Sequence, residues 1–211
     1  MVKKHTKESK PIAWPLIVGA IALIAIIFLV TFLFSREDPV DYSTYNQFEF
    51  TQLDGGWQTL VEKDGELFQI PFYTHPLDIA NVTYEEKVTQ DLLDLFRTIQ
   101  PQRTLWIAVA PDASPNSVLA GVNIARITGR FYESTTQSAF YTNMTGMNFT
   151  RPTVTCENAT LRNTILIIDE NATDNAVRYR DDYCLEVTGT SVPNLLMSAD
   201  MLGYKLLGIM Q

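Results

Sequence analysis

An uncharged run of 23 residues, from Ile12 to Phe34, most constrains how this chain can fold. As a helix rising about 1.5 Å per residue, it would be about 34 Å long, enough to cross a hydrocarbon core of about 30 Å. A cleaved signal peptide has a shorter apolar core, of about 7–15 residues, and a small-residue cleavage site. The sequence therefore predicts an uncleaved transmembrane anchor over residues 12–34.

The charges that flank this run predict its orientation. Residues 1–11 carry four lysines and one acidic residue, whereas residues 35–46 carry one arginine and three acidic residues. Because the more basic flank of a membrane span stays in the cytoplasm, the rest of the chain is expected outside the cell membrane. We predict a cytoplasmic tail over 1–11, a polar linker over 35–46 and one extracytoplasmic domain over 47–211.

The predicted external part is strongly acidic. The chain has 16 basic and 24 acidic residues, and removing the four lysines and the glutamate of the tail leaves 12 and 23, a formal charge of −11. Binding to nucleic acid requires clustered lysine and arginine, so we expect no nucleic-acid partner. The expected partners are the membrane, through the single anchor, and another envelope protein or a glycan.

Five Asn-x-Ser/Thr triplets follow the predicted anchor, and none has proline in the middle. The 11 Asn and 32 Ser or Thr among 211 residues would give about 1.7 such triplets by chance. Clustering of Asn and Thr in turns is the alternative explanation. As glycosylation sites of an external glycoprotein they predict modification of Asn81, Asn143, Asn148, Asn158 and Asn171.

Cys156 and Cys184 are the only two cysteines, and both lie in the predicted external part. An oxidising compartment favours a disulfide between them. Two thiols without neighbouring histidines fall short of the four ligands of a structural zinc ion, so no metal site is expected. No phosphate-binding glycine loop is present either, and we expect no cofactor.

The pattern of the external part indicates an α/β sandwich with a mixed sheet. Two apolar segments flank Asp64-Gly65, which predicts a hairpin. Helical spacing begins after a capping box at Thr83 and Glu86, and a second helix, capped by Ser114, should end at Gly129. The remaining predicted elements are strands in 104–110, SAFYT, TILIID, AVRY and CLEVTG, and a last helix after Ser191.

The segment 110–117 is the most site-like, because it connects a predicted buried strand to a helix N-terminus. Asp169 ends the TILIID strand and would lie near Asp112 if the two strands are parallel neighbours. Turn and cap roles are the alternative interpretation of these residues. Candidate ligand-binding residues are therefore Asp112, Ser114, Asn116, Ser117 and Asp169. No catalytic residue is assigned, and Asp200, near Lys205, is expected to make a surface contact.

The lysine-rich tail, the single anchor, TILIIDENATDNAVRY and CLEVTGTSVPNLLMSADMLGYKLLGI together resemble uncharacterised single-pass, membrane-anchored surface proteins of archaea. The similarity covers about the last 50 residues and implies a cell-envelope location. It matches no defined binding or catalytic motif, so it implies no ligand or activity.

Three functional hypotheses follow. The first is a non-enzymatic envelope protein that binds another surface component. The second is an envelope hydrolase or carbohydrate-active enzyme whose pocket contains Asp112, Asp169 and His75; its two carboxyl groups should converge. The third is an accessory subunit of a membrane complex, which should expose an apolar patch.

Overall fold

The structure is a computed structural model that describes residues 18–19, 21–24, 26–27, 40–97, 104–142 and 151–211. Two compact units, Met1–Asp41 and Tyr42–Gln211, divide the chain. In the first unit the described residues between 18 and 27 are helical, and most of the predicted anchor lies outside the described residues. Within the described ranges, no helix has the length and apolar character needed to cross a membrane.

The second unit begins with a four-stranded antiparallel sheet in the order β1-β2-β3-β4. The predicted hairpin is confirmed: β3 and β4 pair from Trp57–Phe72 to Lys63–Glu66, and Asp64 and Gly65 turn the chain with positive φ angles of 55° and 82°. β1 lies in residues that the sequence assigned to the linker. The strands are β1 (Thr44–Tyr45), β2 (Phe48–Leu53), β3 (Gly56–Lys63) and β4 (Glu66–Phe72).

A six-stranded mixed sheet forms the larger part of the unit, in the order β5-β9-β10-β8-β6-β7. β10, β8, β6 and β7 are parallel to one another, whereas β9 is antiparallel to β10. The predicted mixed sheet is therefore confirmed. The strands are β5 (Thr83–Tyr84), β6 (Thr104–Val109), β7 (Thr135–Phe140), β8 (Asn163–Asp169), β9 (Ala176–Asp181) and β10 (Cys184–Thr188).

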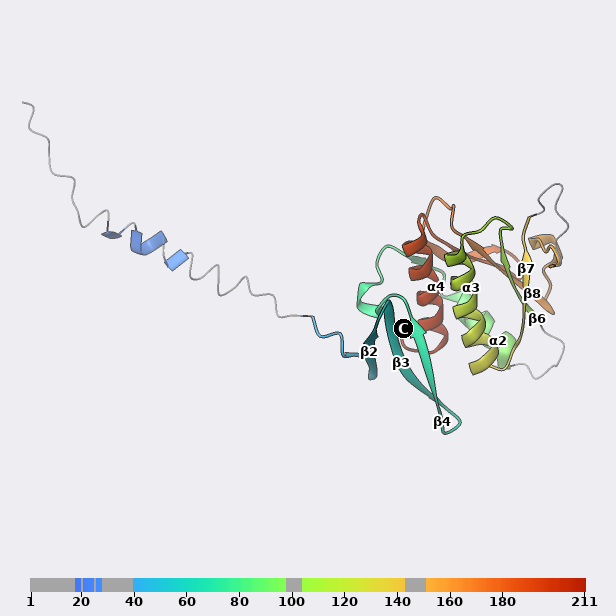
Figure 1. Cartoon of the computed structure of the whole chain (residues 1–211), viewed down its shortest axis with the longest axis horizontal. Helices are drawn as coiled ribbons and strands as arrows, with labels where there is room; N and C mark the ends of the chain where they lie inside the picture. Colours follow the sequence, from blue (N-terminus) through green and yellow to red (C-terminus); the bar gives the residue numbers. More distant parts are fainter. Residues whose placement is uncertain (1–17, 20, 25, 28–39, 98–103, 143–150) are drawn as a thin grey trace, which may run out of the picture. The chain divides into compact units, whose positions relative to one another are not determined.

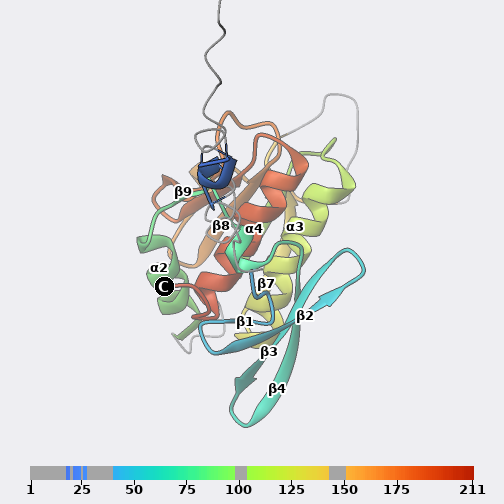
Figure 2. The ribbon, with the colours of Figure 1, turned by 90° about the vertical axis from the view of Figure 1, so that its left-hand side faces the viewer.

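The helices α3 and α4 lie between the two sheets (Figure 1). On one side Phe72 of β4 stacks on Tyr204 of α4, and on the other side alternate residues of the mixed sheet, such as Leu166 and Val187, join the same core. Figure 2 shows the antiparallel strands crossing over these helices. The helices are α2 (Lys87–Arg97), α3 (Pro115–Ala125) and α4 (Val192–Leu206), with short turns η1 (Pro76–Asp78), η2 (Arg126–Phe131) and η3 (Cys156–Asn158).

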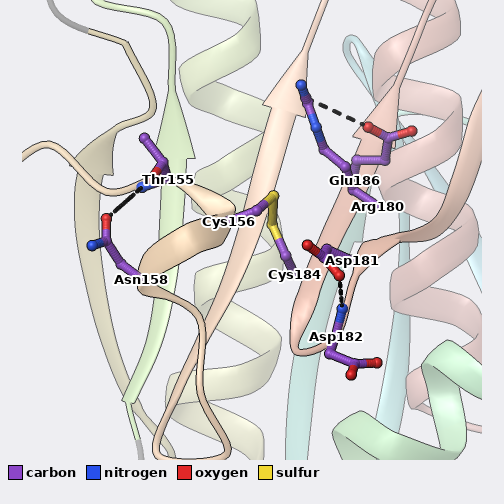
Figure 3. The surroundings of a disulfide bond; sticks show 8 residues. All are labelled: Thr155, Cys156, Asn158, Arg180, Asp181, Asp182, Cys184 and Glu186. Carbon is purple, nitrogen blue, oxygen red and sulfur yellow. Dashed lines mark hydrogen bonds and ion pairs between the residues drawn. A yellow bond between two sulfur atoms is a disulfide. The ribbon is translucent and has the colours of Figure 1, made fainter.

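The opposite face of the mixed sheet has a smaller apolar cluster. Ala108, Ile165 and Ile167 of the sheet pack there against Val154 from the segment after β7. The predicted disulfide is present and ties this segment to the sheet, because Cys156 in η3 bonds to the fully buried Cys184 of β10 (Figure 3). The two Cα atoms are 5.3 Å apart.

Two predicted helix ends differ from the structure. Thr83 does not cap α2: it lies in β5, where its N–H donates to Asn175 O at 2.9 Å, so the pairing with the sheet prevails over the capping-box pattern. The helix then begins at Lys87. Gly129 does not end α3 either, because a π-helical turn, η2, continues the chain through Phe131. The capping of α3 by Ser114, with Pro115 as its first residue, is confirmed.

Candidate functional site

The predicted loop 110–117 does connect a strand to a helix N-terminus, but the chain itself occupies that terminus. Glu170, directly after β8, accepts a hydrogen bond from the backbone N–H of Ser114 at 2.7 Å through Oε1. Its Oε2 accepts bonds from the hydroxyls of Ser114 and Ser117, the latter at 2.6 Å. Burial raises the pKa of Glu170, but these hydrogen bonds outweigh it and hold the pKa below its usual range. Ser114 and Ser117 therefore bind an internal carboxylate.

Asp169 was predicted to lie near Asp112 if the strands that precede them are parallel neighbours, and the structure meets this condition. β6 and β8 are adjacent and parallel, with Val109 opposite Ile168, so the two aspartates follow neighbouring strand ends. Burial, together with the charges of Asp169 and Asp112, raises the pKa of Tyr141 to about 12. Asp112 is exposed, and Asp169 Oδ1 accepts the N–H of Asn171 at 3.0 Å in a turn.

These positions carry no further sign of a binding site. Asn116 is exposed and lies in the first turn of α3. Over the described ranges, no group of three or more His, Cys, Asp or Glu side chains is arranged to hold a metal ion. The structure thus accounts for Ser114, Ser117 and Asp169 as residues that stabilise turns and a helix end, and the ligand-binding role of the set stays a prediction.

His75 lies in a different layer from the two aspartates. It is fully buried beside η1, and the rings of Tyr42, Phe50 and Trp57 surround it with centroid distances of 4.7–4.9 Å. Its Nδ1 accepts the N–H of Leu77 at 3.2 Å, so the proton of the neutral ring is on Nε2. Burial lowers the pKa of His75, which favours this neutral form. The hydrolase hypothesis, which placed His75 beside Asp112 and Asp169, gains no support.

Asp200 does not make the surface contact expected from the sequence. It is only 1% exposed, on the side of α4 that faces the antiparallel sheet. Oδ2 accepts the backbone N–H groups of Tyr73 and Thr74 at 2.8 and 2.7 Å. Burial raises the pKa of Asp200 to about 7. The prediction for Asp200 was wrong because the antiparallel sheet covers a face of α4 that would otherwise be exposed.

Three of the five predicted glycosylation sites fall among the described residues. Asn81, Asn158 and Asn171 are all exposed, as attachment of a glycan requires. Asn143 and Asn148 lie outside the described residues.

A groove between α3 and β7, which the sequence analysis did not predict, is the best candidate site. Its volume is about 680 Å³. Ile107 and Val109 of β6 form the floor, and Val118 and Val122 of α3 form one wall. Both valines are exposed, at 39% and 44%, and Leu119 beside them is 39% exposed. Exposed apolar side chains of α3 therefore lie along one side of the groove, and the accessory-subunit hypothesis stays a prediction.

The polar lining of the groove is cationic. Arg130 and Arg151 both line it, together with Ser134, Thr136 and Ser138, and no Asp or Glu is among its lining residues. Neither arginine forms a salt bridge within the described part of the chain. Glu133, close by in sequence, pairs instead with Lys63 at 3.3 Å. In an acidic chain this groove is therefore a local concentration of positive side chains.

No family, curated protein or solved structure matches this chain in comparisons with all three. The candidate site therefore rests on geometry alone.

The sequence contains only a weak signal for this groove. Arg130 and Arg151 are 21 positions apart, and nothing in the pattern between them indicates that they line one cavity. The polar run TTQSAF in β7 is the best available clue, since exposed Thr, Gln and Ser in a strand indicate an edge of a sheet.

Proposed function

We propose that this protein is a non-enzymatic cell-envelope component, anchored by one N-terminal span, whose external domain binds an anionic partner protein in the groove between α3 and β7. The observation that carries the proposal is the groove itself: among the described residues, its lining combines apolar side chains with two arginines that form no salt bridge, and it includes no acidic side chain. The exposed valines of α3 supply apolar area, and the arginines select for negative charge.

The physical features of the groove agree with recognition rather than catalysis. The described residues that line it include no histidine, cysteine or carboxylate that could act as a nucleophile or general base. The external location rests on the predicted anchor, the basic tail and the exposed sequons, and the disulfide agrees with an oxidising compartment.

Site-specific photo-crosslinking of the full-length protein in its native membrane tests the proposal. A photoreactive residue at Val122 should capture a discrete partner, and one at Leu161, which is 50% exposed outside the groove, should not. Capture should weaken with added salt and be lost in the Arg130→Gln/Arg151→Gln variant. The exposed Arg162→Gln serves as the matched control and should retain it. Equal capture from both positions, or capture that is independent of the two arginines, would refute the proposal.

A further inference from the structure

β7 is the last strand of the mixed sheet, and its outer edge faces the groove. The N–H of Tyr141 donates to Val109 O at 3.2 Å, toward β6. Because alternate residues of a strand direct their backbone groups to opposite sides, Ala139 and Gln137 also face β6. The N–H and C=O groups of Ser138 and Thr136 therefore point outward, along the groove.

The chain itself shows that this edge can accept another strand. Phe140 is the next outward-facing residue, and its N–H donates to Pro152 O at 2.9 Å while its C=O accepts the N–H of Val154 at 2.8 Å. Thr153 thus pairs with Phe140 in parallel orientation. Proline has no N–H to donate, so Pro152 cannot extend this ladder to the C=O of Ser138. Among the described residues, backbone pairing at this edge therefore ends at Phe140.

No backbone hydrogen bond reaches the outward groups of Ser138 or Thr136 from any residue that the structure describes. Both residues line the groove, and Ser138 is exposed. With respect to the described residues, the two N–H and two C=O groups form an open row of donors and acceptors at the edge of a sheet. Such a row is the feature that extended peptides recognise when they add a strand.

Arg130 and Arg151 lie near the two ends of this row of backbone groups. Arg130 lies in η2, just before the start of β7, and Arg151 lies over the ring of Phe140 at the end of β7, 5.8 Å from its centroid. From Thr136 to Phe140 a strand advances about 13 Å, at about 3.3 Å per residue. Two acidic side chains four residues apart on one face of an extended peptide would span that distance. The residue midway between them would face Val118 and Val122.

We infer that the groove binds an extended acidic segment of a partner protein, which adds a short strand to β7 at Thr136 and Ser138. The segment has the pattern acidic-x-apolar-x-acidic: its carboxylates pair with Arg130 and Arg151, and its central apolar side chain packs on α3. This inference rests on the proposed function and specifies its ligand. A compact anionic molecule without a peptide backbone could use the arginines but not the edge of β7.

The first test measures binding of a labelled peptide, acetyl-Thr-Glu-Thr-Val-Thr-Glu-Thr-amide, to the full-length protein in lipid nanodiscs by fluorescence polarisation. Binding should fall at least about tenfold in Arg130→Gln/Arg151→Gln, a loss of about 1.4 kcal/mol, and stay unchanged in Arg162→Gln. Absence of binding at about 1 mM peptide would overturn the inference.

The second test isolates the backbone pairing. Ser138→Pro removes an outward N–H without removing a bond to β6, and proline is tolerated in an edge strand at such a position. It should weaken binding about tenfold, whereas Ser138→Ala, which keeps the N–H, should not change it. Thermal unfolding of both variants checks that each is folded.

A third measurement uses the unaltered protein, so it does not depend on the folding of a variant. Two versions of the peptide carry N-methyl groups on alternate backbone amides, so that each amide is methylated in one version only. The version whose methylated amides would face β7 should lose binding, and the other should bind like the parent peptide. If both bind like the parent peptide, the ligand is not an added strand, and the strand inference fails. The proposed function would still stand if capture at Val122 depends on the arginines; it fails separately if that capture is absent.

Discussion

Glu170, at the carboxyl end of β8, caps α3 by accepting the backbone N–H of Ser114 at 2.7 Å. The carboxylate also lies at the positive end of the helix dipole, which stabilises negative charge. The helix N-terminus in the loop predicted to bind a ligand is thereby occupied by a residue 56 positions further along the chain than Ser114. The consequence is structural: the contact fastens α3, one wall of the groove, to the sheet.

Glu170→Ala should destabilise the protein by about 1–2 kcal/mol, because three hydrogen bonds at the start of α3 are lost. The pKa of Glu170 is lowered in the folded state, so its contribution is present above the usual glutamate pKa and is lost as the pH falls through the folded value. Urea unfolding at neutral and acidic pH measures both effects. Glu157→Ala, at an exposed position, is the control, and an equal loss there would contradict the capping role.

Asp200→Asn should remove a pH dependence of stability. The folded protein raises the pKa of Asp200 from 3.8 to about 7, so the folded state holds a proton that the unfolded state releases. Stability is full below about pH 4 and falls as the pH rises to about 7. Above that range the variant, which stays neutral, should be more stable than the wild type by about 1–4 kcal/mol.

Urea unfolding at several values between pH 4 and pH 8 provides the measurement for Asp200. The amide oxygen of Asn can still accept the N–H groups of Tyr73 and Thr74, so the comparison isolates the charge. Asp182→Asn, at an exposed position, should leave the slope unchanged. Parallel slopes for wild type and Asp200→Asn would show that ionisation of Asp200 is not the cause.

The elements of the fold were largely predictable because each has a local signal. Asp64-Gly65 specifies the β3–β4 turn, Ser114-Pro115 specifies the start of α3, and continuous apolar runs specify β6 and β8. Neither the burial of Asp200 nor the edge position of β7 has such a signal. Asp200 is buried only because β4 and the following residues pack over α4, and β7 is an edge only because of the strand order. The groove depends on the second of these, so local patterns could not predict it.

Gly203→Ala should destabilise the packing between α4 and its neighbours. A Cβ atom at Gly203 would lie 2.7 Å from Cδ1 of Ile127 and 3.0 Å from Cε1 of Phe72, closer than carbon atoms pack. We expect a cost of about 1–3 kcal/mol, reduced to the extent that these side chains can shift. Ser198→Ala on the same helix is the contrast: it removes a buried hydroxyl that has no hydrogen-bond partner among the described residues, and it should be neutral or stabilising. Thermal unfolding ranks the two variants, and the reverse order would contradict this packing.

Reduction of the Cys156–Cys184 disulfide should lower stability by about 3–4 kcal/mol, since the bond closes a loop with a sequence separation of 28. The loss should concentrate on the segment that covers the second face of the mixed sheet, because Val154 packs there beside the bond. Hydrogen exchange of the full-length protein with and without reductant can locate the change. Cys156→Ser/Cys184→Ser should match the reduced wild type and be insensitive to reductant. Increased exchange spread evenly over α3 and α4 would instead mean that the bond supports the whole domain and not this segment alone.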